Sequence, residues 1–443
     1  MANNAREIAL RVLRRVHFDN AYSDLALSSE LNQTDLQDAD RALVTELTYG
    51  VLRHRTYLDW LINQASHTTA DKMELRVLDA LRLGIYQLFF LDRVPDYAAV
   101  SESVALVPRR AAGLVNAVLR RLQRDRGNRP KPRTNDPLSR AEILHSHPRW
   151  ILDMWEKQFG VDETLALARV NQNTPPAVLR VNLSSKSRDE VIEQLTEAGA
   201  APTPYSPWGV VVEKIGPALR HPLFAMGVLT VQSEASQLVG ELTGAQPGER
   251  VLDVCAAPGG KATHVAELVG PGGRVLALDV RPNRLRLINS NVKRMGIGNV
   301  AAKVRDANVP WKKAEIGEGF DRVLVDAPCT SLGTLAKQPE LKWRLGPTDP
   351  SRLAEVQREI LLHSADAVRP GGTLLYSVCT LTREETSGVV DFFLRERDDF
   401  ELDDLRRDFA PRYDVFLRED GTFQSLPSRT GTEGMYAARF VRR

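Results

Sequence analysis

The chain has 443 residues, of which 43% are hydrophobic and 26% charged, proportions typical of a globular protein. This length predicts two or three domains rather than one core, and a net charge of +2 excludes no class of partner by itself. Three cysteines argue against a disulfide framework and favour a reducing compartment. The N-terminal residues hold no apolar signal segment, and no apolar run approaches the roughly 20 residues that span a bilayer. We therefore expect a cytoplasmic protein without a membrane segment.

Residues 1–135 are predicted to form an all-α domain. Strand-like alternation is scarce there, whereas apolar residues recur with the spacing of a helix face. Three such stripes are Ala5-Ile8-Ala9-Val12-Leu13-Val16, Leu78-Leu81-Ile85-Leu88-Phe89 and Leu114-Val115-Val118-Leu119-Leu122. The end of this region is basic, and its arginines include Arg109, Arg110, Arg120, Arg121 and Arg124. The charge continues through Arg129 to Arg133 in a proline-containing linker.

The middle region, residues 136–224, mixes both patterns and is predicted to be a small α+β domain. Helices are expected over residues 150–159 and 188–198, and strands over residues 177–182 and 210–212.

Residues 225–443 alternate between apolar runs of strand length and helical segments. The strand runs lie at residues 251–254, 275–278, 300–304, 322–325 and 373–377. Such alternation predicts a doubly wound parallel sheet of the Rossmann-like α/β class.

A loop of small residues follows the first of these strands. It consists of Cys255, Ala256, Ala257, Pro258, Gly259, Gly260 and Lys261, and helix formers come after it. Such a loop lets a ligand approach the backbone near the amides of a helix N-terminus. Because the loop lacks the G-x-G-x-x-G pattern, a nicotinamide cofactor is not the first choice.

Aspartates end the next three strands, at Asp279, Asp306 and Asp326. Asp279 follows the glycines by about 20 residues, the spacing at which a carboxylate binds ribose hydroxyls. Carboxylates at successive strand ends suit a neutral or cationic ligand better than a phosphate-rich one. Each aspartate alone is equally well explained as a turn or helix cap. Together with the glycine loop, they predict S-adenosylmethionine as the cofactor.

Two cysteines each follow a predicted strand, Cys329 in Asp326-Ala327-Pro328-Cys329 and Cys379 in Ser377-Val378-Cys379-Thr380. The carboxyl ends of parallel strands line the ligand crevice of an open α/β sheet, so both thiols are expected to face one substrate. A thiol pair there favours covalent chemistry. The alternative is a buried structural cysteine. For Cys255 we prefer that alternative and expect only its backbone to meet the cofactor.

Several segments resemble the Sun/Fmu group of RNA 5-methylcytosine methyltransferases. The similar segments in the C-terminal half are residues 232–237, 255–261, 326–329, 339–343 and 371–379. In the helical region, residues 40–41, 49–53 and 115–120 resemble the NusB-like domain that one subgroup carries. The resemblance therefore spans nearly the full length of the chain.

The resemblance implies transfer of a methyl group from S-adenosylmethionine to C5 of a cytosine in small-subunit ribosomal RNA. A thiolate that adds to C6 makes C5 nucleophilic. In DNA cytosine methyltransferases the cysteine of a Pro-Cys pair attacks, which here would be Cys329. The RNA group instead implies attack by Cys379 and release assisted by Cys329. Asp326 is expected to bind the N3/N4 edge of the base, and Lys261 to point to the same site unless it is a solvated lysine.

The target nucleotide is expected to be unpaired or flipped. The stretch from Arg109 to Arg133 is the predicted phosphate-binding surface, and its alternative is a solvated helix face with a linker. Residues 147–150 and 180–182 are predicted to clamp the RNA. The eight histidines show no ligand spacing with the cysteines, so no metal is expected. We expect a monomer.

Three other functions stay open. In the first, the RNA substrate is tRNA or large-subunit ribosomal RNA. In the second, the chain is an inactive RNA-binding or antitermination factor, and in the third it methylates a small molecule. Two departures from the group bear on how RNA is held: Leu335-Ala336-Lys337-Gln338, where basic residues are common, and Glu433-Gly434-Met435-Tyr436 in place of Asp-Gly-Phe-Phe.

Overall fold

The computed structural model describes residues 4–128 and 130–443. Arg129, part of the predicted basic stretch, and residues 1–3 of the predicted helical domain lie outside the described residues. The chain divides into two compact units. The first unit holds the residues up to Thr174 together with residues 335–347, and the second holds residues 175–334 and 348–443. The predicted boundaries after residues 135 and 224 stay predictions.

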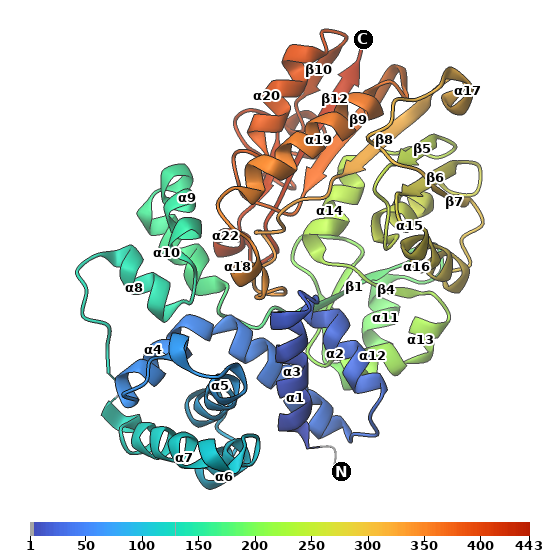
Figure 1. Cartoon of the computed structure of the whole chain (residues 1–443). Helices are drawn as coiled ribbons and strands as arrows, with labels where there is room; N and C mark the ends of the chain where they lie inside the picture. The colour runs from blue at the N-terminus through green and yellow to red at the C-terminus, as the bar shows by residue number, and fades with distance from the viewer. Residues whose placement is uncertain (1–3, 129) are drawn as a thin grey trace. The chain divides into compact units, whose positions relative to one another are not determined.

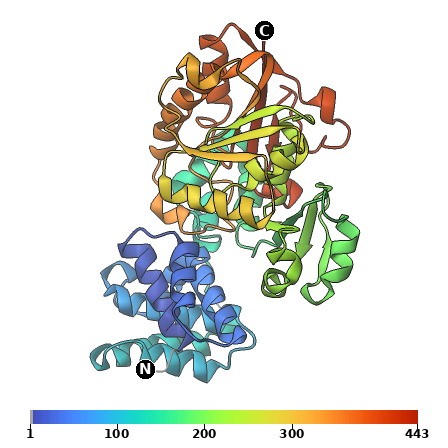
Figure 2. The same ribbon diagram turned by 90° about the vertical axis from the view of Figure 1, so that its right-hand side faces the viewer.

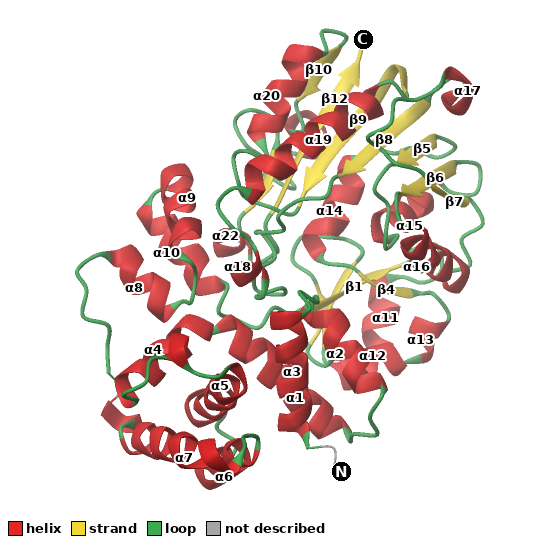
Figure 3. Cartoon of the chain, viewed as in Figure 1, coloured by secondary structure: helices red, strands yellow, loops and turns green. Residues whose placement is uncertain are grey.

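The first unit is built from helices, drawn red in Figure 3. They are α1 (Ala5–Phe18), α2 (Ser23–Asn32), α3 (Asp38–Arg53), α4 (Arg55–Ala65), α5 (Leu75–Phe90), α6 (Asp96–Ala105), α7 (Arg109–Arg124), α8 (Pro137–Leu144), α9 (Arg149–Phe159), α10 (Val161–Val170) and α18 (Leu341–Arg344). Helix α5 is buried on nearly every face, whereas α7 buries one stripe, Val115, Val118, Leu119 and Leu122. Within the described residues the first strand begins only at Ala177, which confirms the predicted all-α region.

The inserted segment, residues 335–347, interrupts the sequence of the second unit and is hydrogen-bonded to helix ends of the first unit. The Lys342 ammonium donates to the Arg53 carbonyl over 2.8 Å, and the Trp343 indole donates to the Leu52 carbonyl over 3.0 Å. Both carbonyls belong to the last turn of α3, where the helix itself leaves acceptors unpaired. At the start of α2, Glu340 accepts from the Ser23 amide over 3.0 Å. The segment that follows the Cys329 loop in the chain therefore folds as part of the helical unit.

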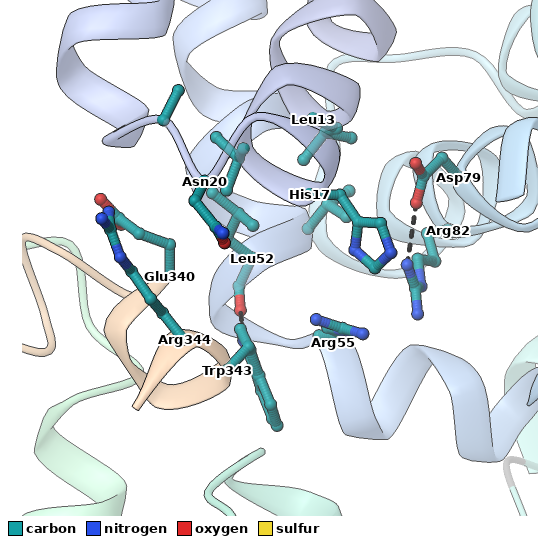
Figure 4. A pocket seen from close by; sticks show the side chains of 13 residues that line it. Leu13, His17, Asn20, Leu52, Arg55, Asp79, Arg82, Glu340, Trp343 and Arg344 are labelled. Atoms are coloured by element: carbon teal, nitrogen blue, oxygen red, sulfur yellow. Dashed lines mark hydrogen bonds and ion pairs between the residues drawn. The ribbon is translucent and has the colours of Figure 1, made fainter. Parts of the chain in front are cut away.

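A pocket in this unit lies among α1, α3, α4, α5 and α18 (Figure 4). Trp343 and Arg55 line it, with the Arg55 guanidinium 5.2 Å from the centre of the Trp343 ring. Arg82, at the other side of the pocket, pairs with Asp79 over 2.8 Å and with Asp59 over 2.7 Å. The pocket is lined by no cysteine, and its most buried arginine is already neutralised within the unit. It is therefore not a site for thiol chemistry.

A four-stranded antiparallel sheet opens the second unit, and Figure 2 shows it in green from the side. Its order is β2-β3-β1-β4. The elements here are β1 (Ala177–Val181), α11 (Arg188–Gln194), β2 (Ala200–Pro202), β3 (Gly209–Val212), α12 (Ile215–Arg220), α13 (Pro222–Ala225) and β4 (Leu229–Val231). The sequence predicted β1, α11 and β3, but the short strands β2 and β4 were missed.

The second unit also holds an eight-stranded sheet of order β10-β12-β9-β8-β5-β6-β7, with β11 paired to β12 (Figure 1). Its strands are β5 (Arg250–Asp253), β6 (Arg274–Asp279), β7 (Val300–Val304), β8 (Phe320–Asp326), β9 (Val368–Val378), β10 (Phe400–Asp403), β11 (Phe423–Ser425) and β12 (Met435–Arg442). Its helices are α14 (Glu234–Leu242), α15 (Gly260–Val269), α16 (Pro282–Arg294), α17 (Lys313–Ile316), α19 (Asp349–Ala365), α20 (Ser387–Glu396), α21 (Arg406–Phe409) and α22 (Pro427–Thr430).

Strands β5 to β9 pair in parallel, as the alternating pattern predicted. The chain runs outward from β5 to β6 and β7, then returns to the other side of β5 as β8 and continues to β9. Helices α15 and α16 connect the strands on one side of β5, α19 connects β8 to β9 on the other, and the strand order reverses between β5 and β8. The crevice that ligands use in such sheets lies at the carboxyl ends of these strands.

Antiparallel strands that the sequence did not predict extend the parallel sheet at its C-terminal edge. Strand β12 runs antiparallel to β9, and β10 and β11 run antiparallel to β12. Most of β12 is buried and its apolar residues do not alternate with polar ones, so the two-residue period that reveals a half-buried strand is absent. Among the described residues, no helix is long and apolar enough to cross a membrane.

Candidate active site

Three strand ends bring the predicted catalytic residues together. Asp326 is the last residue of β8 and lies in register with Ser377 of β9. The loops that leave these two strands carry Cys329 and Cys379, whose sulfurs lie 3.4 Å apart. Lys261, in the first turn of α15 after β5, donates to Asp326 over 2.6 Å. Four residues that are far apart in sequence thus share one crevice, as the sequence analysis predicted.

The Lys261–Asp326 pair is only partly shielded from solvent. The Lys261 side chain is 11% exposed and the Asp326 side chain 31%. Burial alone would lower the pKa of Lys261, but the Asp326 carboxylate outweighs burial and the pKa is raised. The other Asp326 oxygen accepts from the Ser377 hydroxyl over 2.8 Å. Lys261 and Ser377 therefore hold the two Asp326 oxygens in one orientation.

The two thiols are not equivalent. The hydrogen bond from Cys329 lowers the pKa of Cys379 against the effect of burial, and Ser331 and Lys261 act in the same direction. The same hydrogen bond, together with burial, raises the pKa of Cys329. The thiolate is the reactive form of a cysteine, and of the two thiols Cys379 has the surroundings that favour this form.

Ser331 contributes to this difference and was not predicted. Its hydroxyl lies 3.3 Å from the Cys379 sulfur and 3.8 Å from the Cys329 sulfur. The residue has a φ of 56°, a left-handed conformation that is uncommon for serine. No local sequence pattern predicts which residue the turn between Cys329 and Gly333 contacts. The residue contacted, Cys379, lies in the loop after another strand.

The glycine loop has the shape of a ligand cradle. Gly259 has a φ of 103°, and a Cβ added there would lie 3.3 Å from the Ile288 backbone, so the position favours glycine. Gly260 begins α15, whose first amides face the loop. Beside the loop, Asp253 is 1% exposed, and neither of its carboxylate oxygens has a well-formed hydrogen bond among the described residues. The Cys255 amide is close enough to lower the pKa of Asp253, and this buried acid at the start of the glycine loop fits a ligand that brings further donors.

Burial, followed by the negative charge of Asp326, raises the pKa of Asp253 to about 8. A cationic ligand group would reverse this effect and hold Asp253 as a carboxylate. S-adenosylmethionine has an ammonium and a sulfonium, so the donor set fits this cofactor. Asp253 was not among the predicted cofactor residues. Its position at the end of β5, which matches that of Asp326 at the end of β8, is the signal that would have identified it.

The other predicted cofactor residues differ in their surroundings. Asp279 is buried at the end of β6 and accepts from the Arg281 amide over 2.9 Å. Asp306 is exposed and accepts from the Asn308 amide over 2.9 Å, which is the turn role considered as its alternative. Cys255 packs against the core of the sheet, and burial followed by the charge of Asp253 raises the pKa of Cys255, so its thiol is unreactive.

The predicted RNA-binding arginines lie on one helix of the first unit. Arg109, Arg110, Arg120, Arg121 and Arg124 are all exposed on α7. Arg110 pairs with Glu74 over 3.2 Å, but both side chains are largely exposed, so the pair leaves the guanidinium accessible. The stripe opposite these arginines is the buried apolar one.

The predicted RNA clamp is wrong for two of its residues. Arg180 is fully buried, forms an ion pair with Glu267 and donates to Thr263 over 3.0 Å. It joins β1 to α15 inside the second unit and cannot meet a phosphate. His147 is also fully buried and contacts the carbonyl of His145 over 2.5 Å. Both residues were expected at the surface because their side chains are polar. Each has a polar partner inside the protein instead.

The two departures from the family pattern are structural. Leu335 is buried where the inserted segment begins. Gly434 donates to the Gly333 carbonyl over 2.8 Å, and Gly333 in turn donates to the Cys379 carbonyl over 3.0 Å. Met435 and Tyr436 are buried in the sheet. The Gly434 backbone and the buried Met435 and Tyr436 therefore support the cysteine loops from within, whereas Glu433 is half-buried.

Comparison with known proteins agrees with this architecture. Three family models match the chain: the NusB family over residues 3–124, an RsmF/B-like methyltransferase ferredoxin-like domain over residues 147–218, and the 16S rRNA methyltransferase RsmB/F over residues 242–441. Fold and matches together define a Rossmann-like methyltransferase preceded by a NusB-like helical domain and a ferredoxin-like domain.

Relatives extend the match over the whole chain. The chain is 35% identical to the probable ribosomal RNA small subunit methyltransferase B of Bacillus subtilis (strain 168), over 98% of this chain and 97% of that protein. The crystal structure of PH0851 superposes with a TM-score of 0.80 at 29% identity over 99% of each chain. A methyltransferase homolog protein from Pyrococcus horikoshii gives a TM-score of 0.60 at 25% identity, over 70% of this chain and 100% of that one. The chain belongs to the 16S rRNA methyltransferase RsmB/F family and is a ribosomal RNA methyltransferase.

Proposed function

We propose that the protein transfers a methyl group from S-adenosylmethionine to C5 of a cytosine in small-subunit ribosomal RNA. The observation that carries this proposal is the pair of thiols 3.4 Å apart beside the Lys261–Asp326 ion pair. A methyltransferase that acts on a nucleophilic oxygen or nitrogen needs no thiol, whereas C5 of cytosine must first be activated by addition at C6. The second thiol gives the reaction a group that assists product release.

S-adenosylmethionine supplies the methyl group when it is bound. Asp253 and the loop from Ala256 to Gly260 would hold its charged end, because a buried acid and the first amides of a helix adjoin there. The carboxylates at the ends of β6 and β7, Asp279 and Asp306, would bind the adenosine.

In the proposed reaction the Cys379 thiolate forms a bond to C6 of the base. Asp326 accepts hydrogen bonds from the N3–H and N4–H edge, which favours the N3-protonated ring that receives the electron pair of the C5–C6 double bond. C5 then bonds to the methyl carbon as the bond from that carbon to the sulfonium sulfur breaks. The C5 proton passes to solvent water, and the C5–H electron pair re-forms the C5–C6 double bond. The C6–sulfur bond breaks, and its electron pair returns to Cys379. The Cys329 thiol donates a hydrogen bond to the departing thiolate and so stabilises the leaving group.

For RNA binding, we propose that the α7 arginines contact phosphates. They carry at least five exposed guanidiniums on one helix face, which is the electrostatic pattern that nucleic-acid backbones attract. The NusB-like match over residues 3–124 supports a role of this helix in RNA contact.

Mapping of 5-methylcytosine in ribosomal RNA tests the substrate. Cells that lack the gene should lose one 5-methylcytosine in small-subunit RNA and regain it when the gene is returned. Loss of the mark from tRNA or large-subunit RNA instead would support the rival substrates. If no mark changes and calorimetry detects no S-adenosylmethionine binding, the chain is an inactive RNA-binding protein.

A further inference from the structure

A buried carboxylate outside the reacting groups joins the two cysteine loops. Glu385 lies in the loop between β9 and α20 and is fully buried. One of its oxygens accepts from the Thr330 amide over 2.8 Å and from the Gln357 amide over 3.0 Å. The other accepts from the hydroxyls of Thr330 over 2.5 Å, Thr382 over 2.9 Å and Thr380 over 3.2 Å. Every neighbour is a donor, so the site is built for a carboxylate.

The partners of Glu385 are the residues that follow the two cysteines. Thr330 comes directly after Cys329, and Thr380 comes directly after Cys379. The hydroxyls of these two threonines also lie 2.8 Å from each other. Gln357 of α19 adds a third connection, because it donates to the Pro328 carbonyl over 2.9 Å and accepts from the Tyr376 hydroxyl over 3.0 Å. One acid therefore ties both loops to each other and to α19.

We propose that Glu385 is a positioning residue that holds the Cys329 and Cys379 loops at the separation that the two-thiol reaction requires. This inference rests on the proposed function. Glu385 acts through the amide and hydroxyl of Thr330 on the Cys329 side and through the hydroxyls of Thr380 and Thr382 on the Cys379 side. The Glu385 charge also favours the protonated form of Cys329, since it raises the pKa of that thiol. Glu385 thus helps to keep a proton on the releasing thiol while it sets the distance between the two sulfurs.

The test measures the thiols without RNA. The full-length protein is alkylated with iodoacetamide across a range of pH, and mass spectrometry follows the Cys329 and Cys379 peptides separately. In Glu385→Ala the loops lose their common partner, so the alkylation of Cys379 should move to higher pH as its hydrogen bond with Cys329 is lost. Steady-state methylation of RNA should fall about 100-fold in kcat, because small misplacements of reacting groups have effects of this size. The KM for RNA should stay nearly unchanged.

Two further variants distinguish positioning from simple destabilisation. Glu385→Gln keeps the shape; its NH2 group has two hydrogens and can donate to two of the three hydroxyls, while its carbonyl oxygen still accepts from the Thr330 and Gln357 amides. It should restore most of the kcat, while the loss of charge moves Cys329 alkylation to lower pH. Glu384→Gln, at the exposed neighbouring position, should behave as the unchanged protein. If Glu385→Ala does not fold, Thr380→Val, which removes one contact on the Cys379 side, takes its place.

Unchanged alkylation profiles of both cysteines in Glu385→Ala, or in Thr380→Val where that variant takes its place, would overturn the inference. This outcome differs from failure of the proposed function, in which the unchanged protein would not methylate a cytosine at all.

Discussion

The crevice at the ends of β5, β8 and β9 and the arginine face of α7 differ in how their charged groups are held. In the crevice nearly every charged group has a specific partner, as Lys261 has Asp326 and as Cys379 has Cys329 and Ser331. On α7 the guanidiniums are exposed and have few partners. Buried partners fix the position of a charged side chain, whereas an exposed charged side chain attracts the opposite charge without fixing its position. Substitutions in the crevice should therefore change the chemical step, and those on α7 should change RNA affinity and its dependence on salt.

The largest effect is expected from Cys379→Ala. Loss of the attacking thiolate should lower methyl transfer by about 10⁴-fold or more, because the raised pKa of Cys329 makes the neighbouring thiol a poor substitute. The measurement is the single-turnover transfer of labelled methyl to the RNA. Cys255→Ala is the matched control and should retain activity, since that thiol is buried and unreactive. Loss of activity in Cys255→Ala with full activity in Cys379→Ala would reverse the assignment.

Asp326→Asn and Lys261→Met should follow in size. Asn replaces one acceptor by a donor that faces the N4–H edge, so transfer should fall by about 10² to 10⁴-fold, the range for a lost acid–base group. Lys261→Met frees Asp326 and removes a charge that helps to lower the pKa of Cys379, so the pH–rate profile should move to higher pH. Lys303→Met, on exposed β7, is the control. A profile that does not move in Lys261→Met would contradict the role of Lys261.

The α7 arginines should affect binding without affecting chemistry. In Arg120→Glu combined with Arg124→Glu, the slope of log affinity against log salt should decrease by roughly 0.7 to 0.9 for each phosphate contact that is lost. The single-turnover rate at saturating RNA should stay the same. Arg93→Glu makes half of that charge change at another exposed position of the helical unit and should leave the slope nearly intact. An equal decrease in both variants would show that only net charge matters.

The smallest effect is expected at Ser331. The hydroxyl helps to lower the pKa of Cys379, so the rate, which rises as Cys379 ionises, should begin to rise at higher pH in Ser331→Ala. At high pH the two rates should converge. Ser331→Gly removes the hydroxyl and also relieves the left-handed backbone, so an equal shift in both variants assigns the effect to the hydroxyl. A shift in only one of them would assign it to the backbone.

The sequence predicted the crevice well because its residues follow strands that a simple alternation reveals. Parallel strand ends meet at one edge, so Lys261, Asp326, Cys329 and Cys379 could be grouped without coordinates. The hydrogen bonds among them could not be predicted in the same way. Glu385 and Ser331 each contact residues in a loop that follows another strand, and no local sequence pattern predicts such contacts.

Burial of polar residues explains most of the remaining errors. Arg180 looks like an RNA-binding arginine until Glu267 is found beside it. Arg439 of β12 likewise pairs with Asp403 over 2.6 Å inside the sheet, in a strand that the sequence did not predict. The inserted segment at Lys342 and Trp343 folds with helices that lie about 290 positions earlier in the chain, as the separation of 289 between Lys342 and Arg53 illustrates. Contacts at such distances leave no periodic signal in one sequence.

The division of roles between the two thiols is the central claim, and the covalent protein–RNA adduct tests it most directly. Each cysteine variant is incubated with S-adenosylmethionine and substrate RNA, and the adduct is measured by denaturing electrophoresis and mass spectrometry. Cys329→Ala should accumulate an adduct through Cys379, because attack proceeds and release is slowed. Cys379→Ala should form none. An adduct through Cys329 in Cys379→Ala, with none in Cys329→Ala, would contradict the account and exchange the two roles.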